Sequence, residues 1–292
     1  MEQFLRLLPK LGKHLRKGDC GRIGVIGGSI EYTGAPYFAA SSICKLGADL
    51  IYVFCSNEAA PIIKTYSPDL IVHPGLKPED VLPKLSRLDA IILGPGLGRN
   101  LSLIPLIDQL LNLMNQKNIP FVIDGDGLWF IAENIEKFPK NMSSTILTPN
   151  FVEFSRLCKA VLDEDNVINC REIKKLEELG IELSRRLNVA IYMKGEIDLI
   201  VTSDGKVSKC EFEASFRRCG GQGDLTAGTL GLLLFWAKKN SDSFQKSFHE
   251  AGIASSWLVR TAGKQAFEKH GRSMNTPLML EEIPKIIKEI EK

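Results

Sequence analysis

The chain has 292 residues, of which 44% are hydrophobic and 25% are charged, with 37 Lys and Arg against 35 Asp and Glu. These values are typical of a globular protein and exclude a disordered, collagen-like or coiled-coil chain. The net charge of +2 gives no electrostatic argument for binding nucleic acid or an anionic membrane, so we expect neither as a partner.

The N-terminal segment and the cysteines bear on the cellular compartment. Residues 1–17 are mildly basic and amphipathic but lack a long apolar core, which excludes a secretory signal and leaves a mitochondrial transit segment as the weaker alternative. The seven cysteines are odd in number and include no C-x-x-C pair, and the four histidines are far apart. This pattern disfavours a structural zinc site and favours free thiols in a reducing compartment, so we expect a cytoplasmic protein.

Short apolar runs alternate with helical stretches along the chain. Strands are predicted over residues 22–26, 49–55, 69–72, 88–93, 120–123, 144–147 and 189–193. Helices are predicted over residues 35–46 (with Gly47 as C-cap), 101–116, 172–187 and from residue 151. The C-terminal part is predicted to contain a hairpin over residues 198–213, a long apolar helix through residue 236, and helices over residues 243–262 and 280–290.

Alternating strands and helices predict the fold class. Continuously apolar strands are typical of a mainly parallel sheet that helices cover on both faces. The length alone suggests about two domains. Because the chain has no linker, low-complexity tract or internal repeat, we expect one α/β domain over residues 1–292.

Glycine-bearing loops follow or precede the predicted elements at four places. They cover residues 27–28, 94–98, 124–127 and 220–224. A glycine after a strand is most often only a turn residue, but ligands of open α/β sheets bind at the carboxyl ends of the strands. Four such loops therefore favour a binding cleft at that edge of the sheet.

The loop over residues 220–224 carries the strongest chemical signal. It directly precedes the apolar helix, whose first backbone N–H groups carry roughly +0.5 of an elementary charge and suit phosphate. It is not a Walker A loop, because no Lys-Ser or Lys-Thr pair follows. Asp224 in the first turn is either a helix-capping carboxylate or a base that takes a proton from a hydroxyl during phosphoryl transfer. The electrostatic cost of a carboxylate beside phosphate favours the base.

Two further positions allow both a structural and a functional interpretation. Lys194 follows a predicted strand and either binds a phosphate or is a solvated turn residue. Asn150 and Glu153 fit an N-cap and capping box, and Glu153 alternatively holds a water-shelled Mg²⁺ near phosphates.

Taken together, the motifs resemble one family, the NAD(P)H-hydrate dehydratases of the ribokinase-like superfamily. The resemblance covers roughly residues 10–290, with every motif in the family's order. It rests on Gly24-Val-Ile-Gly-Gly-Ser, Tyr32-Thr-Gly-Ala-Pro, Leu93-Gly-Pro-Gly-Leu-Gly-Arg, Val122-Ile-Asp-Gly-Asp-Gly, Leu147-Thr-Pro-Asn with Glu153, Lys194-Gly-Glu and Cys219-Gly-Gly-Gln-Gly-Asp-Leu.

The resemblance implies a ribokinase-like fold and a lyase that repairs damaged cofactors. A nucleotide phosphorylates the hydroxyl of hydrated NADH or NADPH, the phosphate leaves, and the normal cofactor returns. Bacterial members typically carry a threonine-glycine form of the anion loop and use ADP, whereas residues 220–224 resemble the ATP-using, eukaryotic branch. Mg²⁺ is implied by the phosphoryl chemistry, with no direct protein ligand assigned.

The same resemblance implies roles for individual residues. Asp224 is implied as the catalytic base and as a substrate contact. The hydrated dinucleotide is expected to face Gly96, Gly98, Asn150, Phe151, Val152, Glu153, Phe154, Ser155 and Arg156. The nucleotide is expected to face Lys194, Gly195, Glu196, Ile197, Asp198, Ser215, Phe216, Arg217, Arg218, Cys219, Gly220, Gly221, Gln222 and Gly223. Residues 27–28 and 32–36 are expected to close the substrate side.

Two other functions compete with this one. A small-alcohol kinase of the same superfamily, of the hydroxymethylpyrimidine or thiazole type, would use the same anion loop and base but release a phosphorylated product. A regulatory nucleotide-binding protein without catalysis would have no need of Asp224 beside the anion loop. The sequence does not rank NADH hydrate against NADPH hydrate, and the family's frequent oligomers allow a homo-oligomer that the sequence does not test.

Overall fold

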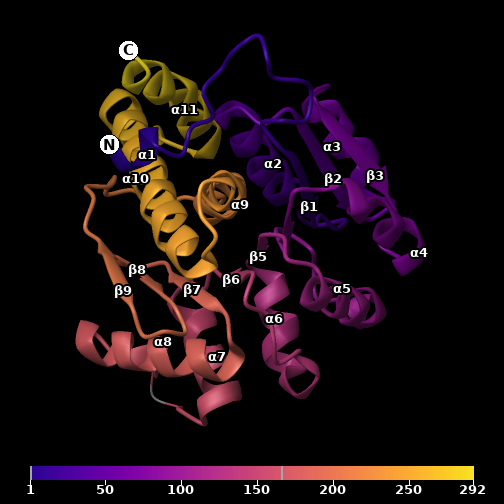
Figure 1. The fold of residues 1–292 in the computed structure, drawn as a ribbon, viewed down its shortest axis with the longest axis vertical. Helices are drawn as coiled ribbons and strands as arrows, with labels where there is room; N and C mark the ends of the chain where they lie inside the picture. The colour runs from indigo at the N-terminus through magenta and orange to yellow at the C-terminus, as the bar shows by residue number, and fades with distance from the viewer. Residues whose placement is uncertain (1, 166) are drawn as a thin grey trace.

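A computed structural model describes residues 2–165 and 167–292, and over these residues nine strands form one sheet (Figure 1). The order across the sheet is β3-β2-β1-β4-β5-β6-β7-β8-β9. The strands are β1 Arg22–Ile26, β2 Leu50–Cys55, β3 Leu70–Pro74, β4 Ala90–Leu93, β5 Phe121–Ile123, β6 Thr145–Leu147, β7 Ala190–Met193, β8 Asp198–Val201 and β9 Val207–Cys210.

Strands β1 to β7 pair in parallel, and the β8–β9 hairpin adds to β7 in antiparallel orientation. Strands β4 to β8 are buried at every position, which explains their continuously apolar sequences. The predicted mainly parallel sheet and the predicted hairpin are both confirmed.

Helices cover both faces of the sheet. One layer contains α1 Glu2–Leu5, α2 Gly34–Leu46, α3 Ala59–Tyr66, α9 Gln222–Lys239, α10 Phe244–His270 and α11 Thr276–Ile290. The other layer contains α4 Pro78–Val81, α5 Ile104–Gln116, α6 Asp126–Glu133, α7 Phe151–Leu162 and α8 Ile173–Leu187. Each layer packs its own hydrophobic core against one face of the sheet. The helices therefore cover the faces, and the carboxyl ends of the parallel strands are left to the connecting loops.

Helix α9 lies at the centre of its layer, between α2 and α10 (Figure 1). Most of its residues from Leu225 to Ala237 are buried, because neighbours surround it on several sides. Thr229 Oγ1 hydrogen-bonds Ser255 Oγ of α10 at 2.8 Å, and this buried contact joins the two helices. The N-terminus of α9 is therefore held firmly at the edge where the strands end.

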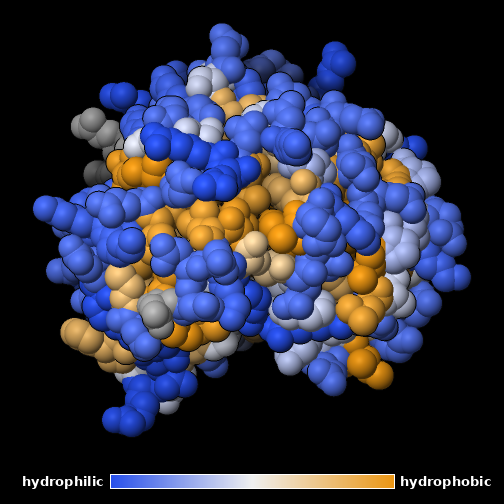
Figure 2. Space-filling view, turned by 90° about the horizontal axis from the view of Figure 1, so that it is seen from below, coloured by the Kyte–Doolittle hydropathy of each residue, from blue (hydrophilic) through white to orange (hydrophobic). Residues whose placement is uncertain are grey.

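The surface is mainly polar. Figure 2, which views the molecule from the side of α7 and α8, shows hydrophilic side chains around the periphery and a band of hydrophobic side chains across the middle. Exposed hydrophobic residues of this kind are common on folded proteins. No helix within the described residues has the length and apolar character that a membrane span requires.

The predicted elements agree well with the structure, but some short helices were not predicted, α10 runs to His270 rather than residue 262, and α11 begins at Thr276 rather than residue 280. Gly47 ends α2 with φ 111°, as its predicted C-cap role requires. Helices α3 and α6 are absent from the sequence prediction. Each has eight residues, and α6 begins directly after Gly125 in a stretch whose glycines indicate a loop.

Candidate functional site

The loops at the carboxyl ends of the central strands contact one another through their backbones. The amide of Gly28 donates to the carbonyl oxygens of Pro95 (3.0 Å) and Gly96 (3.1 Å). Gly94 approaches so closely that a Cβ atom there would lie 1.8 Å from the Asp124 carbonyl oxygen. These contacts bring the predicted glycine loops over residues 27–28, 94–98 and 124–127 to one edge of the sheet.

The loops after β6 and β7 extend the same edge. Thr148 Oγ1 donates to Asp124 Oδ1 at 2.8 Å, and the Lys194 amide donates to the Pro149 carbonyl oxygen at 2.8 Å. The parallel register explains the proximity, because five neighbouring strands end at similar heights. Polar groups from five loops thus lie along the same end of the sheet.

The fourth glycine loop supplies the start of α9. Its N-cap is Gly221, with φ 95° and no side chain that could cap the helix. The amide of Leu225 makes the first bond within the helix, to Gly221 O, so the N–H groups of Gln222, Gly223 and Asp224 have no partner from the helix itself. Free N–H groups at the positive end of a helix can bind an anion, as the sequence predicted.

Asp224 lies in this first turn and does not cap it. Burial raises the pKa of the Asp224 carboxyl well above its ordinary value, and the nearby Asp124 carboxylate raises it further. The Lys194 ammonium opposes this shift, and Glu153 adds to it. A carboxylate in such surroundings is a stronger base than a solvated one, because protonation relieves both desolvation and repulsion.

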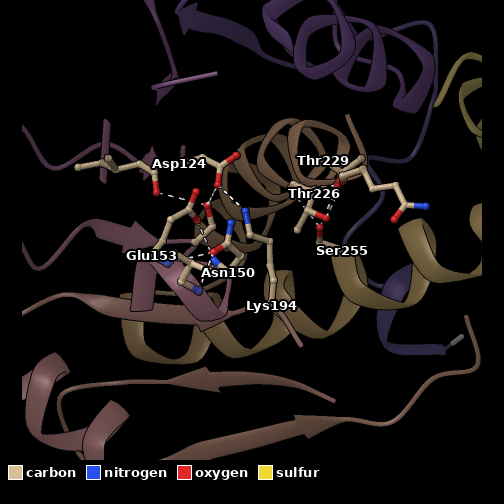
Figure 3. Close-up of polar contacts among 11 residues, drawn as sticks. Asp124, Asn150, Glu153, Lys194, Thr226, Thr229 and Ser255 are labelled. Carbon is tan, nitrogen blue, oxygen red and sulfur yellow. Dashed lines mark hydrogen bonds and ion pairs between the residues drawn. The ribbon is translucent and has the colours of Figure 1, made fainter. Parts of the chain in front are cut away.

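The Lys194 ammonium lies among the carboxylates of Asp124 and Glu153 (Figure 3). Its Nζ lies 2.6 Å from Asp124 Oδ1, and the side chain is 19% exposed. Burial alone lowers the pKa of Lys194, but Asp124 and Glu153 outweigh burial, and the net pKa is raised. A Cβ atom at Gly223 would lie 3.2 Å from this Nζ, so the ammonium also faces the start of α9. Lys194 is therefore not a solvated turn residue.

Asn150 and Glu153 form the predicted capping box of α7. Asn150 Oδ1 accepts from the amides of Val152 and Glu153, each at 3.0 Å, and Glu153 Oε2 accepts from the Asn150 amide at 2.8 Å. Burial raises the pKa of Glu153, while the Lys194 ammonium lowers it. The predicted capping box is confirmed, and the Glu153 carboxylate also lies near the Lys194 ammonium and the Asp124 carboxylate.

A cavity of about 520 Å³ opens beside Lys194 and the start of α9. This volume is within the range of small-molecule sites, roughly 300–1,000 Å³. Among the residues predicted to face the nucleotide, it is lined by Lys194, Gly195, Asp198, Ser215, Arg218, Cys219, Gln222 and Gly223. Asn150 and Phe151, predicted to face the dinucleotide, line it too.

The other predicted nucleotide contacts lie outside the lining of this cavity. They are Glu196, Ile197, Phe216, Arg217, Gly220 and Gly221. Arg217 donates from Nε to the Met274 carbonyl oxygen at 2.7 Å, and the Phe216 side chain is 95% exposed.

The predicted substrate side lies next to the loop over residues 29–32. A Cβ atom at Gly96 would lie 2.8 Å from the backbone oxygen of Tyr32, and one at Gly98 would lie 3.3 Å from Ser29. The amide of Gly98 donates to Asp126 Oδ2 at 2.9 Å. These contacts place the early loop beside residues 96–98, and its closure of the substrate side stays a prediction.

The α7 segment predicted to face the dinucleotide does not turn all its side chains to one place. Val152 is exposed, Ser155 and Arg156 are half-buried, and Phe154 is fully buried in the core. Phe154 presents no side-chain surface to a ligand.

Several residues in or beside the cavity were given no role by the sequence, and two of them are charged. Asp124 is one of them, and its signal was a carboxylate directly after a buried strand. Arg260 is the other, and it pairs with Asp198 across 62 positions of sequence, which no local pattern reveals. Within the described residues, no group of three His, Cys, Asp or Glu side chains is arranged to hold a metal ion.

Comparisons with known proteins agree on one family. The sequence model described as NAD(P)H-hydrate dehydratase matches residues 23–285. A Caenorhabditis elegans protein named ATP-dependent (S)-NAD(P)H-hydrate dehydratase is 65% identical over 292 residues, covering 100% of this chain and 95% of that protein. A Mus musculus protein of the same name is 43% identical, covering 95% of this chain and 81% of that protein.

A solved structure supports the fold. The ADP/ATP-dependent NAD(P)H-hydrate dehydratase of Bacillus subtilis, co-crystallised with ATP and Mg²⁺, superposes with a TM-score of 0.77 at 22% identity. The superposition covers 99% of this chain and 97% of that one.

Proposed function

This chain belongs to the NAD(P)H-hydrate dehydratase family, and we propose on that premise that it uses ATP to return hydrated NADH or NADPH to the normal cofactor. It is an enzyme of the lyase class with the ribokinase-like fold. In the proposed reaction the ring hydroxyl takes the terminal phosphoryl group of ATP and releases ADP. Phosphate then leaves with the hydroxyl oxygen, and a proton leaves the adjacent carbon as the double bond re-forms.

The observation that carries this proposal is the start of α9. Unpaired N–H groups at residues 222–224 can receive a transferring phosphoryl group, and the Asp224 carboxylate stands in the same turn. We assign Asp224 as the base that takes the hydroxyl proton while the oxygen–phosphorus bond forms. Its raised pKa supports the assignment, because the proton goes to a stronger base than a solvated carboxylate.

Lys194 and the neighbouring carboxylates are the groups that can bind the ATP phosphates and Mg²⁺. The Lys194 ammonium can stabilise the phosphates of ATP as a point charge, and Asp124 holds it in position. The carboxylates of Asp124 and Glu153 fit a water-shelled Mg²⁺, which is usually bound by one or two carboxylates together with the phosphates. When bound, Mg²⁺ would neutralise charge that develops on the phosphoryl oxygens.

The direct test is a coupled assay with hydrated NADH. ATP should restore the absorbance of the reduced nicotinamide, with formation of ADP and phosphate. Consumption of ATP with a stable phosphorylated product would indicate the small-alcohol kinase instead. Binding of ATP without turnover would indicate a regulatory protein. Relatives at 65% and 43% identity that are named as dehydratases favour the first outcome.

The choice of nucleotide gives a separate prediction. We expect kcat/KM to be higher with ATP than with ADP, because the loop over residues 219–224 resembles the ATP-using branch and the named relatives are ATP-dependent. Steady-state kinetics at saturating hydrate would measure both values. Equal or better use of ADP would contradict this part of the proposal.

Replacing Lys194 should weaken ATP binding more than hydrate binding. Lys194→Ala removes a charge-assisted contact to phosphate, and we expect a loss of about 1.5–3 kcal/mol in ATP affinity. Calorimetric titration with each ligand measures the difference. Lys137→Ala is the control, because Lys137 forms an exposed ion pair with Asp108 outside the cavity. An unchanged ATP Kd in Lys194→Ala would remove Lys194 from the phosphate site.

We keep as binding candidates all residues predicted to face ATP or the hydrated dinucleotide. Where the side chain of such a residue points away from the cavity, we propose that its backbone makes the contact. One domain over residues 1–292 is supported by the continuous sheet. Seven free thiols support a cytoplasmic location. Small molecules are the proposed partners, and the assembly state is testable by analytical ultracentrifugation.

A further inference from the structure

A buried arginine of α10 joins two segments that line the cavity. The Arg260 side chain is 9% exposed, and its guanidinium makes five hydrogen bonds, as many as it has N–H groups. The acceptors are Asp198 Oδ1 (2.7 Å), Asp198 Oδ2 (2.9 Å), Glu196 O (2.9 Å), Gly195 O (3.0 Å) and Phe212 O (3.3 Å).

The partner of this arginine is equally engaged. Asp198 Oδ1 also accepts from the Gly195 amide at 3.0 Å, while Oδ2 accepts from Tyr192 Oη at 2.8 Å and Ser256 Oγ at 2.7 Å. Five hydrogen bonds from the protein saturate a carboxylate that has about four lone-pair sites. Although Asp198 lines the cavity, its side chain is fully used in holding Arg260 and the turn.

The two acceptor segments are the ones that face the expected nucleotide. Gly195 and Glu196 form the turn after β7, directly beside Lys194. Phe212 lies in the segment after β9 that leads to Ser215 and Arg218, both of which line the cavity. Arg260 therefore connects these two segments by hydrogen bonds to their backbone carbonyls, and it reaches them from a helix rather than from a loop.

We propose that Arg260, with Asp198, is a positioning residue for ATP. It holds the turn after β7 and the segment after β9 in the conformation that receives the nucleotide, before the nucleotide arrives. This inference rests on the proposed assignment of the cavity to ATP. Such preorganisation strengthens binding because ordering of the loops is not required at the moment of association. Lysine cannot replace arginine here, since an ammonium has three donors and no planar fork.

Arg260→Lys tests whether Arg260 positions the segments that bind ATP or only stabilises the fold. We expect the KM for ATP to rise about 10- to 100-fold, with kcat changed by less than about threefold and the KM for the hydrate unchanged. Calorimetric titration with ATP should show the same rise in Kd. The wild-type protein must turn over hydrated NADH with ATP in the same assay. If it does not, the proposed function fails, whatever Arg260→Lys shows.

His249→Gln is the matched control. His249 lies in the same helix, is buried, and hydrogen-bonds Thr202 and Ser208 of the β8–β9 hairpin at 2.9 Å each. It ties α10 to the hairpin without touching the turn at Gly195. We expect this variant to lose thermal stability but to keep the wild-type KM for ATP. If Arg260→Lys also loses stability and keeps that KM, Arg260 is only structural and the proposal is overturned.

A milder variant keeps the test decisive if Arg260→Lys does not fold. Ser256→Ala removes one hydrogen bond to Asp198 and leaves the charge pair intact. We expect the KM for ATP to rise by about fivefold, which corresponds to one hydrogen bond of about 1 kcal/mol. A folded Ser256→Ala protein with an unchanged KM and Kd for ATP would overturn the proposal.

Discussion

Asp224→Asn should give a folded protein that binds ATP and is nearly inactive. The substitution keeps the size of the side chain but removes the base, so we expect turnover to fall by about 10²- to 10⁴-fold. ATP affinity should hold or improve, because a negative charge beside the phosphates is removed. Stopped-flow or steady-state assays with hydrated NADH measure the loss, and calorimetry measures ATP binding.

The same variant should not lose stability. The pKa of Asp224 is raised in the folded protein, so its ionised form opposes folding at every pH above the unfolded value of about 3.9. Asparagine removes this cost, and we expect an equal or higher Tm at neutral pH. Asp108→Asn, at an exposed ion pair outside the cavity, is the matched control and should keep full turnover. Retention of more than about a tenth of wild-type turnover by Asp224→Asn would contradict the base assignment.

The raised pKa also predicts the acid limb of the pH–rate profile. A base must be ionised to act, so kcat/KM should fall as the pH decreases through the pKa of Asp224. Burial and the Asp124 carboxylate place that pKa well above the ordinary value. The half-maximal point of the acid limb should therefore lie clearly above pH ~3.9. A profile that stays flat to the ordinary aspartate pKa would argue against a desolvated base at this position.

Gly94→Ala should be among the most destabilising single substitutions in the chain. Gly94 has φ 119°, and an added Cβ atom would lie 1.8 Å from the Asp124 carbonyl oxygen and 2.7 Å from the Gly127 nitrogen. Both neighbours are backbone atoms, which cannot rotate away as a side chain can. We expect the free energy of unfolding to fall by about 4 kcal/mol or more, since strain and a core clash act together. Urea denaturation measures the change.

Gly47→Ala measures the cost of a positive φ without a steric clash of the added Cβ atom. Gly47 has a similar φ of 111°, but nothing lies within 4 Å of an added Cβ atom. Only the cost of a left-handed backbone remains, and we expect a loss of about 1–2 kcal/mol. The difference between the two variants measures the close approach of the loops after β4 and β5. Equal losses of unfolding free energy in the two variants would mean that these loops can separate without cost, and would contradict the close backbone contact between Gly94 and Asp124.

Much of the fold was predictable because its signals are local. Apolar runs of the right length marked the strands, helical periodicity marked α5, and the Thr-Pro-Asn run at residues 148–150 marked the start of α7. Two eight-residue helices were missed, α6 because its start overlaps the Asp-Gly-Asp-Gly run at residues 124–127, and α3 although it contains no glycine. Motifs in the family's order predicted the family and its activity, because each motif is a short contiguous run of residues, as at residues 219–225.

The sequence alone determined the order of the elements, the end of the sheet that carries the loops, and the glycine loop over residues 220–224 that contains the start of α9. Only the tertiary structure decided which charges meet. Lys194 meets Asp124 across 70 positions, and Arg260 meets Asp198 across 62. It also decided that Asp224 is desolvated and beside other carboxylates, which raises its pKa. The physical reason is that propensity and periodicity act over a few residues, whereas burial and Coulomb interaction depend on how α9 and α10 pack across the sheet.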